Sequence, residues 1–191
     1  MNIKEIAQKC DYYARKEIEA YGLPTIRHYE LSMQAGIKLA ELLNADVDLV
    51  VAGVALMDIK LGQSAKEGKQ PQHVQLSRDY AQELLDEWQV EDSTKEILLN
   101  CVEAHHGKVP FGSLEAEIVA NADCYRFIHP RGVMSFHATV VKRGNDHDAA
   151  LKAVKAKLDE KKAILTLDLA KEDLMKYYDM FNEILCQGLD E

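Results

Sequence analysis

Residues 101–127 read CVEAHHGKVPFGSLEAEIVANADCYRF, and this stretch decides the fold that we expect. Apolar residues recur at helical spacing on both sides of a turn marked by Gly107, Pro110 and Gly112. Ser113 stands where the second helix should begin, and serine is a favoured N-cap residue. The stretch therefore predicts two helices joined by a short turn.

The same helical spacing continues outward over most of the chain. We expect an all-α fold, a helical bundle with helices at about residues 2–20, 28–44, 47–59, 73–88, 92–106, 113–127, 147–162 and 169–188. Gly62, Gly68 and Pro71 indicate a polar loop after the third helix. Residues 131–146 are expected to be irregular, with Val140 and Val141 as a candidate short strand, before a C-terminal helical hairpin.

Composition limits the classes of function. The chain has 191 residues and a formal net charge of −9, which argues against a nucleic-acid polymer as partner because such partners need a basic face. No apolar run approaches the roughly 20 residues that span a bilayer, so we expect no membrane partner. The four cysteines form no Cys-x-x-Cys pair, and a reducing cytoplasm is expected.

Five helices each direct one imidazole or carboxylate toward an apolar face. Residues three, four and seven apart share a helix face. By this spacing the inward-facing polar residues, each on a different helix, are His28, Asp58, His73, His105 and Asp123. A buried carboxylate without a partner costs several kcal/mol. We find no obvious buried Arg or Lys to pair with them, so the set predicts a metal cluster, with Fe, Mn, Zn or Ni suited to imidazole and carboxylate ligands.

Each of these residues also has a structural interpretation. A lone inward histidine is commonly a hydrogen-bonded core residue rather than a ligand. Asp58 alone could cap a turn, and Asp123 alone could accept a buried hydrogen bond. What favours a metal is that all of them occur on successive helices.

The order of these residues resembles the HD-domain superfamily, whose pattern is a His, a His-Asp pair, further His residues in some branches and a closing Asp. RHYELSMQAGIKLA carries His28, ALMDI carries Asp58, and HVQLSRDYAQELL begins with His73. The stretch 101–127 supplies His105 and Asp123. It resembles two branches: bacterial hydrolases of diadenosine tetraphosphate, and a broad group of HD phosphohydrolases in which Gly-Val and an aromatic follow the closing Asp, as Gly132, Val133 and Phe136 do here. The resemblance implies an HD-domain-like helical bundle. The resemblance covers residues 25–136 well, and residues 137–191 are expected to form a C-terminal helical extension packed on this core within a single domain.

The resemblance implies metal-dependent hydrolysis of a phosphate ester or anhydride in a small nucleotide-like substrate. It implies one or two divalent or trivalent transition-metal ions held by His28, Asp58, His73, His105 and Asp123. Asp58, His73 and His105 would be catalytic, because a bound ion lowers the pKa of a water and a carboxylate can orient it. Cationic or polar groups expected to contact substrate phosphates are Lys60, Lys108, Arg126 and His106.

Met57 departs from the pattern, because it stands where the His of the His-Asp pair should be. A thioether is a poor ligand for Fe(III), Mn or Mg. Three outcomes follow: a single ion at Asp58, His73 and His105 with His106 in reserve, a different metal, or a binding module without catalysis. The tandem His105-His106 lacks the Gly-Tyr-Pro motif of the cyclic-di-GMP branch, so that substrate is not expected. A plain helical scaffold is the remaining alternative.

Overall fold

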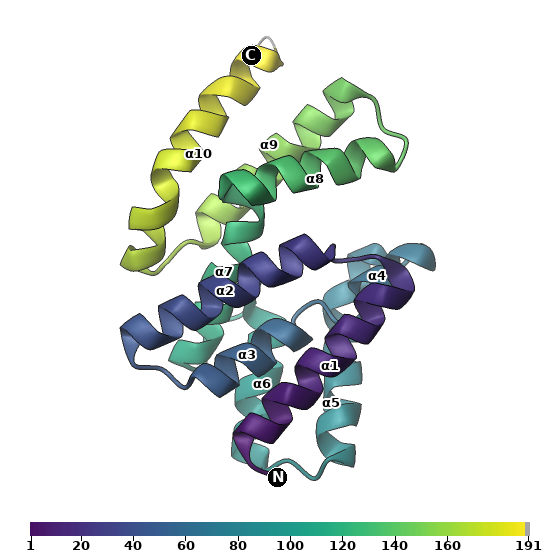
Figure 1. Cartoon of the computed structure of the whole chain (residues 1–191), viewed down its shortest axis with the longest axis vertical. Coiled ribbons are helices and arrows are strands. Elements are labelled where there is room, and N and C mark those ends of the chain that lie inside the picture. Colours follow the sequence, from purple (N-terminus) through teal and green to yellow (C-terminus); the bar gives the residue numbers. More distant parts are fainter. Residues whose placement is uncertain (190–191) are drawn as a thin grey trace.

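The structure is a computed structural model that describes residues 1–189. It is helical throughout, without a strand in that range, and this confirms the predicted all-α class (Figure 1). The helices in chain order are α1 (Ile3–Tyr21), α2 (Ile26–Leu43), α3 (Val47–Leu56), α4 (Leu61–Lys66), the 3-10 turn η1 (Gln70–Gln72), α5 (His73–Glu87), α6 (Asp92–Ala104), α7 (Leu114–Ile128), α8 (Pro130–Lys142), α9 (His147–Ile164) and α10 (Asp168–Gly188).

Helix α7 is the centre of the fold. It packs against α2, α3, α6, α8, α9 and α10, and its residues from Ile118 to Ile128 are all buried. Figure 1 shows α8, α9 and α10 above α2, with α1, α3, α5 and α6 below it. The predicted N-cap is confirmed, because the Ser113 side chain accepts a hydrogen bond from the Ala116 amide at 3.2 Å.

Helix α3 separates two hydrophobic clusters. Val50 and Val54 pack in the cluster around α7, whereas Ala52 and Leu56 pack in the cluster of α1, α5 and α6. Gly53 permits the close approach, because a Cβ there would lie 2.8 Å from Val119 Cγ2 and 2.9 Å from Cys101 Sγ. The turn that follows α3 is therefore held against the ends of α6 and α7.

Two regions differ from the sequence prediction. Residues 131–146, expected to be irregular, contain most of α8, and Val140 and Val141 are helical rather than a strand. Pro130 occupies the first turn of α8, where its missing N–H costs nothing, and the His129 side chain accepts from the Arg131 amide at 3.3 Å. The expected loop after α3 likewise contains the short α4 and η1.

Helices α9 and α10 pack against α7. The division into a core and an extension stays a prediction. All four cysteines are free thiols. The part of the chain that the structure describes contains no helix long and apolar enough to cross a bilayer.

Candidate metal centre

Asp58, in the turn after α3, and Asp123, on α7, meet around one guanidinium. Arg126, one turn after Asp123 on α7, places Nη1 2.6 Å from Asp58 Oδ2 and 2.8 Å from Asp123 Oδ1. The other oxygen of Asp123, Oδ2, lies 2.6 Å from Nζ of Lys161 on α9. All four side chains are buried. The carboxylates thus share a cavity, as expected, but the cation between them belongs to the protein.

This arrangement corrects the expectation that no buried Arg or Lys pairs with the aspartates. Burial alone would raise the pKa of Asp58, but the charge of Arg126 outweighs it and holds this pKa well below its usual range. At Asp123 burial likewise raises the pKa, but the charges of Lys161 and Arg126 outweigh it and lower the carboxyl pKa. The pKa values of both cations are raised, because their carboxylate partners outweigh burial. This half of the site therefore holds two carboxylates and two cations, all ionised.

Three histidines form the other half. His73 begins α5, and His105 and His106 follow the last residue of α6. One ring nitrogen from each of these imidazoles lies within 4.8 Å of the others, which makes them a candidate metal-binding group. The structure thus brings together the His73 and His105 that the sequence predicts as ligands, and it adds His106 to them.

The second nitrogen of each ring is anchored. His105 Nδ1 donates to the Val102 carbonyl at 2.7 Å, and His73 Nδ1 donates to the Gln70 carbonyl at 2.8 Å. His106 Nδ1 lies 3.1 Å from Glu160 Oε1, shorter than its 3.4 Å distance to Lys161 Nζ, and we assign its proton toward the carboxylate. Metal-bound histidines commonly have their other nitrogen fixed in this way. The three Nε2 atoms consequently present lone pairs.

These lone pairs face one another and a carboxylate oxygen. His73 Nε2 lies 3.2 Å from His106 Nε2 and 3.3 Å from Asp58 Oδ1, and His105 Nε2 lies 3.6 Å from the same oxygen. Asp58 Oδ1 and His105 Nε2 are both buried and have no hydrogen-bond partner among residues 1–189. Such orphaned acceptors are costly inside a protein and call for an explanation.

The two halves differ in how well they fit a metal ion. The three imidazole nitrogens suit Zn, Fe, Mn or Ni, and Asp58 Oδ1 lies beside two of them. The orphaned acceptors would be satisfied by such an ion. Between Asp58 and Asp123 the fit fails, because the Arg126 guanidinium lies there. Met57 does not compensate, since it is packed in the hydrophobic core.

The pKa values of His106 and His73 are shifted in opposite directions. Burial lowers the pKa of His106 to about 4 despite its bond to Glu160, so this ring is neutral at pH 7. At His73 burial also lowers the pKa, but the Asp58 carboxylate, whose Oδ1 lies 3.3 Å from Nε2, outweighs it and leaves the pKa raised. Asp58 therefore interacts with a guanidinium through one oxygen and with imidazoles through the other.

Three other predicted site residues lie outside the histidine cluster, although His28 lines the cavity beside it. His28 Nε2 contacts the Gly132 carbonyl at 3.0 Å and must donate there, so this nitrogen is not free to ligate a metal; burial lowers the pKa of His28 to about 4. Lys60 pairs with Glu17 at 2.7 Å and lies over the Tyr80 ring, outside the cavity. Lys108 does not line the cavity either.

A cavity of about 160 Å³ opens onto the metal centre. Its walls include Asp58, Asp123, Arg126, His73 and His106 together with the aromatic rings of Phe127 and Phe136. Three cations that the sequence reasoning missed, namely Arg143, Lys157 and Lys161, also line it. Lys161 had a signal in the sequence, because it lies on the same buried stripe of α9 as Val154 and Leu158.

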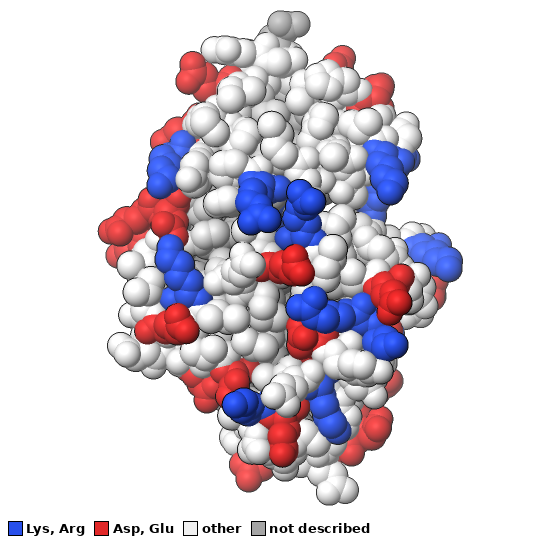
Figure 2. Space-filling view, in the orientation of Figure 1, with Lys and Arg blue, Asp and Glu red and all other residues white. Residues whose placement is uncertain are grey.

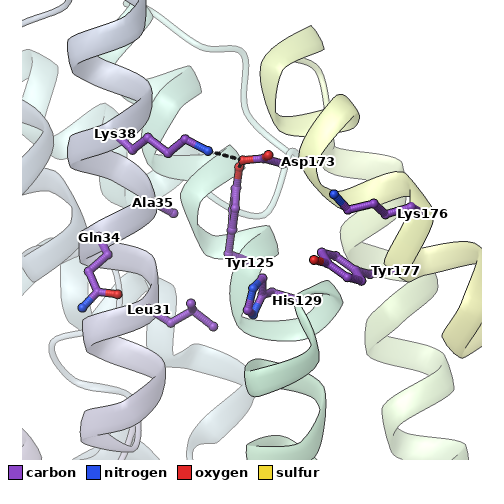
Figure 3. Close-up of a pocket in the computed structure, with 9 residues that line it drawn as sticks. All are labelled: Leu31, Gln34, Ala35, Lys38, Tyr125, His129, Asp173, Lys176 and Tyr177. Atoms are coloured by element: carbon purple, nitrogen blue, oxygen red, sulfur yellow. Dashed lines mark hydrogen bonds and ion pairs between the residues drawn. The ribbon is translucent and has the colours of Figure 1, made fainter.

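A second cavity of about 270 Å³ lies between α2, α7 and α10, away from the metal centre (Figure 3). Lys38 reaches across from α2 to Asp173 on α10 at 2.6 Å, and the Tyr125 hydroxyl of α7 donates to the same Asp173 oxygen at 2.9 Å. This polar junction joins three helices at the rim of the cavity.

No family model matches the chain. Two solved structures are similar to it over nearly their whole lengths. One is described as a predicted HD superfamily hydrolase from an uncultured Thermotogales bacterium, with a TM-score of 0.62, 18% identity, and coverage of 100% of this chain and 98% of the other. The second is a Lactobacillus plantarum protein, with a TM-score of 0.68, 16% identity, and coverage of 98% and 94%. The chain therefore has the fold of the HD-domain superfamily.

Proposed function

We propose that the chain is a metal-dependent hydrolase that cleaves a phosphate ester or anhydride in a small, nucleotide-like compound. The observation that carries the proposal is the convergence of three anchored imidazoles, two of which, His73 and His105, also face the unpartnered Asp58 Oδ1. Catalysis is assigned to Asp58, His73 and His105. We propose one ion, Fe, Mn, Zn or Ni, rather than two, because Arg126 lies between the two aspartates.

An ion bound here would lower the pKa of a coordinated water and neutralise phosphoryl oxygens. Asp58 would orient the attacking water through Oδ1, while Arg126 fixes the carboxylate through Oδ2. Lys157 and Lys161 line the cavity beside the cluster and would contact the non-reacting oxygens of the phosphoryl group. Charged contacts inside a small cavity are stronger than in water, which favours an anionic substrate.

Elemental analysis of protein purified without chelators or a metal-binding tag tests the proposal. We expect close to one transition-metal ion per chain, and hydrolysis of at least one compound in a panel of nucleotides and phosphomonoesters. The His73→Ala variant should lose both the ion and the activity. His147→Ala is the matched control, because His147 is exposed and lies outside the cluster. A metal-free wild-type protein that cannot be loaded with any of the four metals would refute the proposal.

The second candidate is a non-catalytic nucleotide- or phosphate-binding module. It is favoured by Met57, which is buried in the core, and by Arg126, which neutralises both aspartates. A module of this kind should be stabilised against heat by a phosphate compound yet hydrolyse none with any metal supplied. Recovery of metal binding and turnover in a Met57→His variant, when the natural chain has neither, would select this candidate.

A further inference from the structure

A broad groove adjoins the cavity of the metal centre. It has a volume of about 880 Å³ and lies between the end of α1, the α4 segment and the outer face of α8. The groove and the cavity share wall residues: Leu23, Thr25, Gln70, Thr139 and Arg143. The cavity and the groove are therefore adjacent, with these side chains between them.

The groove is positively charged although the chain as a whole is acidic. Its walls carry Lys66, Lys142 and Arg143 and no carboxylate, in a chain with 32 acidic and 23 basic residues. None of these three cations forms an ion pair within residues 1–189, whereas Lys157 and Lys161 at the metal centre do.

The positive surface continues beyond the groove. A shallow hollow next to it shares Ser135 and Ala138 with the groove and carries Arg27 and Arg131, also without a carboxylate in its walls. Figure 2 shows Lys and Arg side chains over the end of α8 and over α4 at the right-hand side of this face. Cations arranged along one groove attract an anion that is longer than a single phosphate.

The cavity is too small to hold such a ligand alone. Ligand pockets commonly measure about 300–1,000 Å³, against about 160 Å³ for the cavity and 880 Å³ for the groove. We propose that the groove is a second anion subsite, and that the substrate carries at least one further phosphoryl group beyond the one cleaved. The cleaved group lies at the cavity, and the rest of the phosphate chain lies between Lys66, Lys142 and Arg143. This inference rests on the proposed function, because it assigns the substrate class of the same site.

The test measures binding of two probes, inorganic orthophosphate and tripolyphosphate, by calorimetry on chelator-treated full-length protein, so that metal capture by the probe does not contribute. We expect tripolyphosphate to bind more tightly than orthophosphate. The double variant Lys66→Gln/Lys142→Gln should weaken tripolyphosphate by about tenfold, the loss expected for two charged contacts, and leave orthophosphate within about twofold.

The matched control is Lys4→Gln/Lys152→Gln, which removes the same charge from exposed lysines that line neither the cavity nor the groove. An equal loss in this control, or equal affinity of the wild type for both probes, would overturn the subsite. A single-stranded RNA oligonucleotide that binds more tightly than tripolyphosphate would overturn it in favour of a polymer partner. These measurements need neither metal nor turnover. Failure of the subsite would therefore leave the proposed hydrolase activity unaffected, and absence of hydrolase activity would leave the subsite measurement unaffected.

Discussion

The two halves of the metal centre handle buried charge in opposite ways. Around Asp123 the protein supplies its own cations, Arg126 and Lys161, and every carboxylate oxygen is paired within 2.8 Å. Around His73, His105 and His106 the protein supplies only acceptors, and Asp58 Oδ1 and His105 Nε2 have no partner. We call the half around Asp123 the closed half, because its carboxylate already has cations. We call the half with the three histidines the open half, because its acceptors lack a cation. The comparison favours the proposed single ion, because only the half with the three histidines lacks a cation of its own.

The largest effect should come from opening the closed half. Arg126→Met removes the shared cation and leaves Asp58 without its partner, so we expect a loss of about 3–5 kcal/mol in the free energy of unfolding, measured by urea denaturation. Arg131→Met, an exposed arginine on α8, should change stability by less than about 0.5 kcal/mol. A change below 1 kcal/mol in Arg126→Met would mean that the two halves are not as different as their contacts indicate.

Removing a metal from the open half should have the next largest effect. A ligand present at 100 times its Kd stabilises the folded state by about 2.7 kcal/mol, and chelation should remove that stabilisation. For a domain of this size each kcal/mol corresponds to about 2–4 °C. We expect the Tm to fall by roughly 5–10 °C in a chelator and to recover when the metal is restored. An unchanged Tm would show that the three histidines hold no ion that stabilises the folded protein.

The anchoring of His106 can be tested separately. Glu160→Ala removes the carboxylate that holds Nδ1 at 3.1 Å, and loss of such an outer partner commonly costs 10–100-fold in metal affinity. Competition with a fluorescent zinc chelator would measure the affinity. Glu183→Ala, an exposed residue of α10, serves as the control and should retain wild-type affinity. Equal affinities in the two variants would remove Glu160 from the metal centre.

The smallest effect is expected at the junction in Figure 3, outside both halves. The hydrogen bond from Lys38, and then that from Tyr125, lower the pKa of Asp173. A lowered folded-state pKa stabilises the protein above the unfolded value of 3.8, and this stabilisation is lost as pH falls through the folded pKa. Because the pair is largely exposed, Asp173→Asn should cost at most about 1 kcal/mol at pH 7.

Urea midpoints at pH 7 and pH 3 check the sign, since the difference between wild type and Asp173→Asn should shrink at the lower pH. Asp179→Asn, exposed on the same helix, is the control. A difference that grows in acid would contradict the assigned pKa direction.

Much of the fold and part of the centre could be predicted from the sequence. Helical spacing indicated most of the helices, and it placed Asp58, His73, His105 and Asp123 on inward faces that do meet. Periodicity reports which face of a helix is buried, so it works where a polar residue stands on an apolar stripe.

The other contacts of the site depend on how different helices pack together, which the periodicity of one helix does not predict. Arg126 bridges two aspartates because α7 packs against α3 and the turn that follows it, and His28 bonds the Gly132 carbonyl because α2 meets α8. Residues 131–146 form most of α8 although Gly132, Thr139 and Val140 have low helix propensity, because Pro130 suits the first turn of a helix and the His129 side chain caps it.

Asp58 is shared between the two halves, one oxygen for each. A guanidinium covalently attached to α7 cannot diffuse away, so the geometry of the ligand cage persists when the exchangeable ion is absent. The empty and loaded forms should then differ little in backbone structure. Such a protein can release one metal and accept another without refolding, and the ion it carries in a cell would follow the local supply.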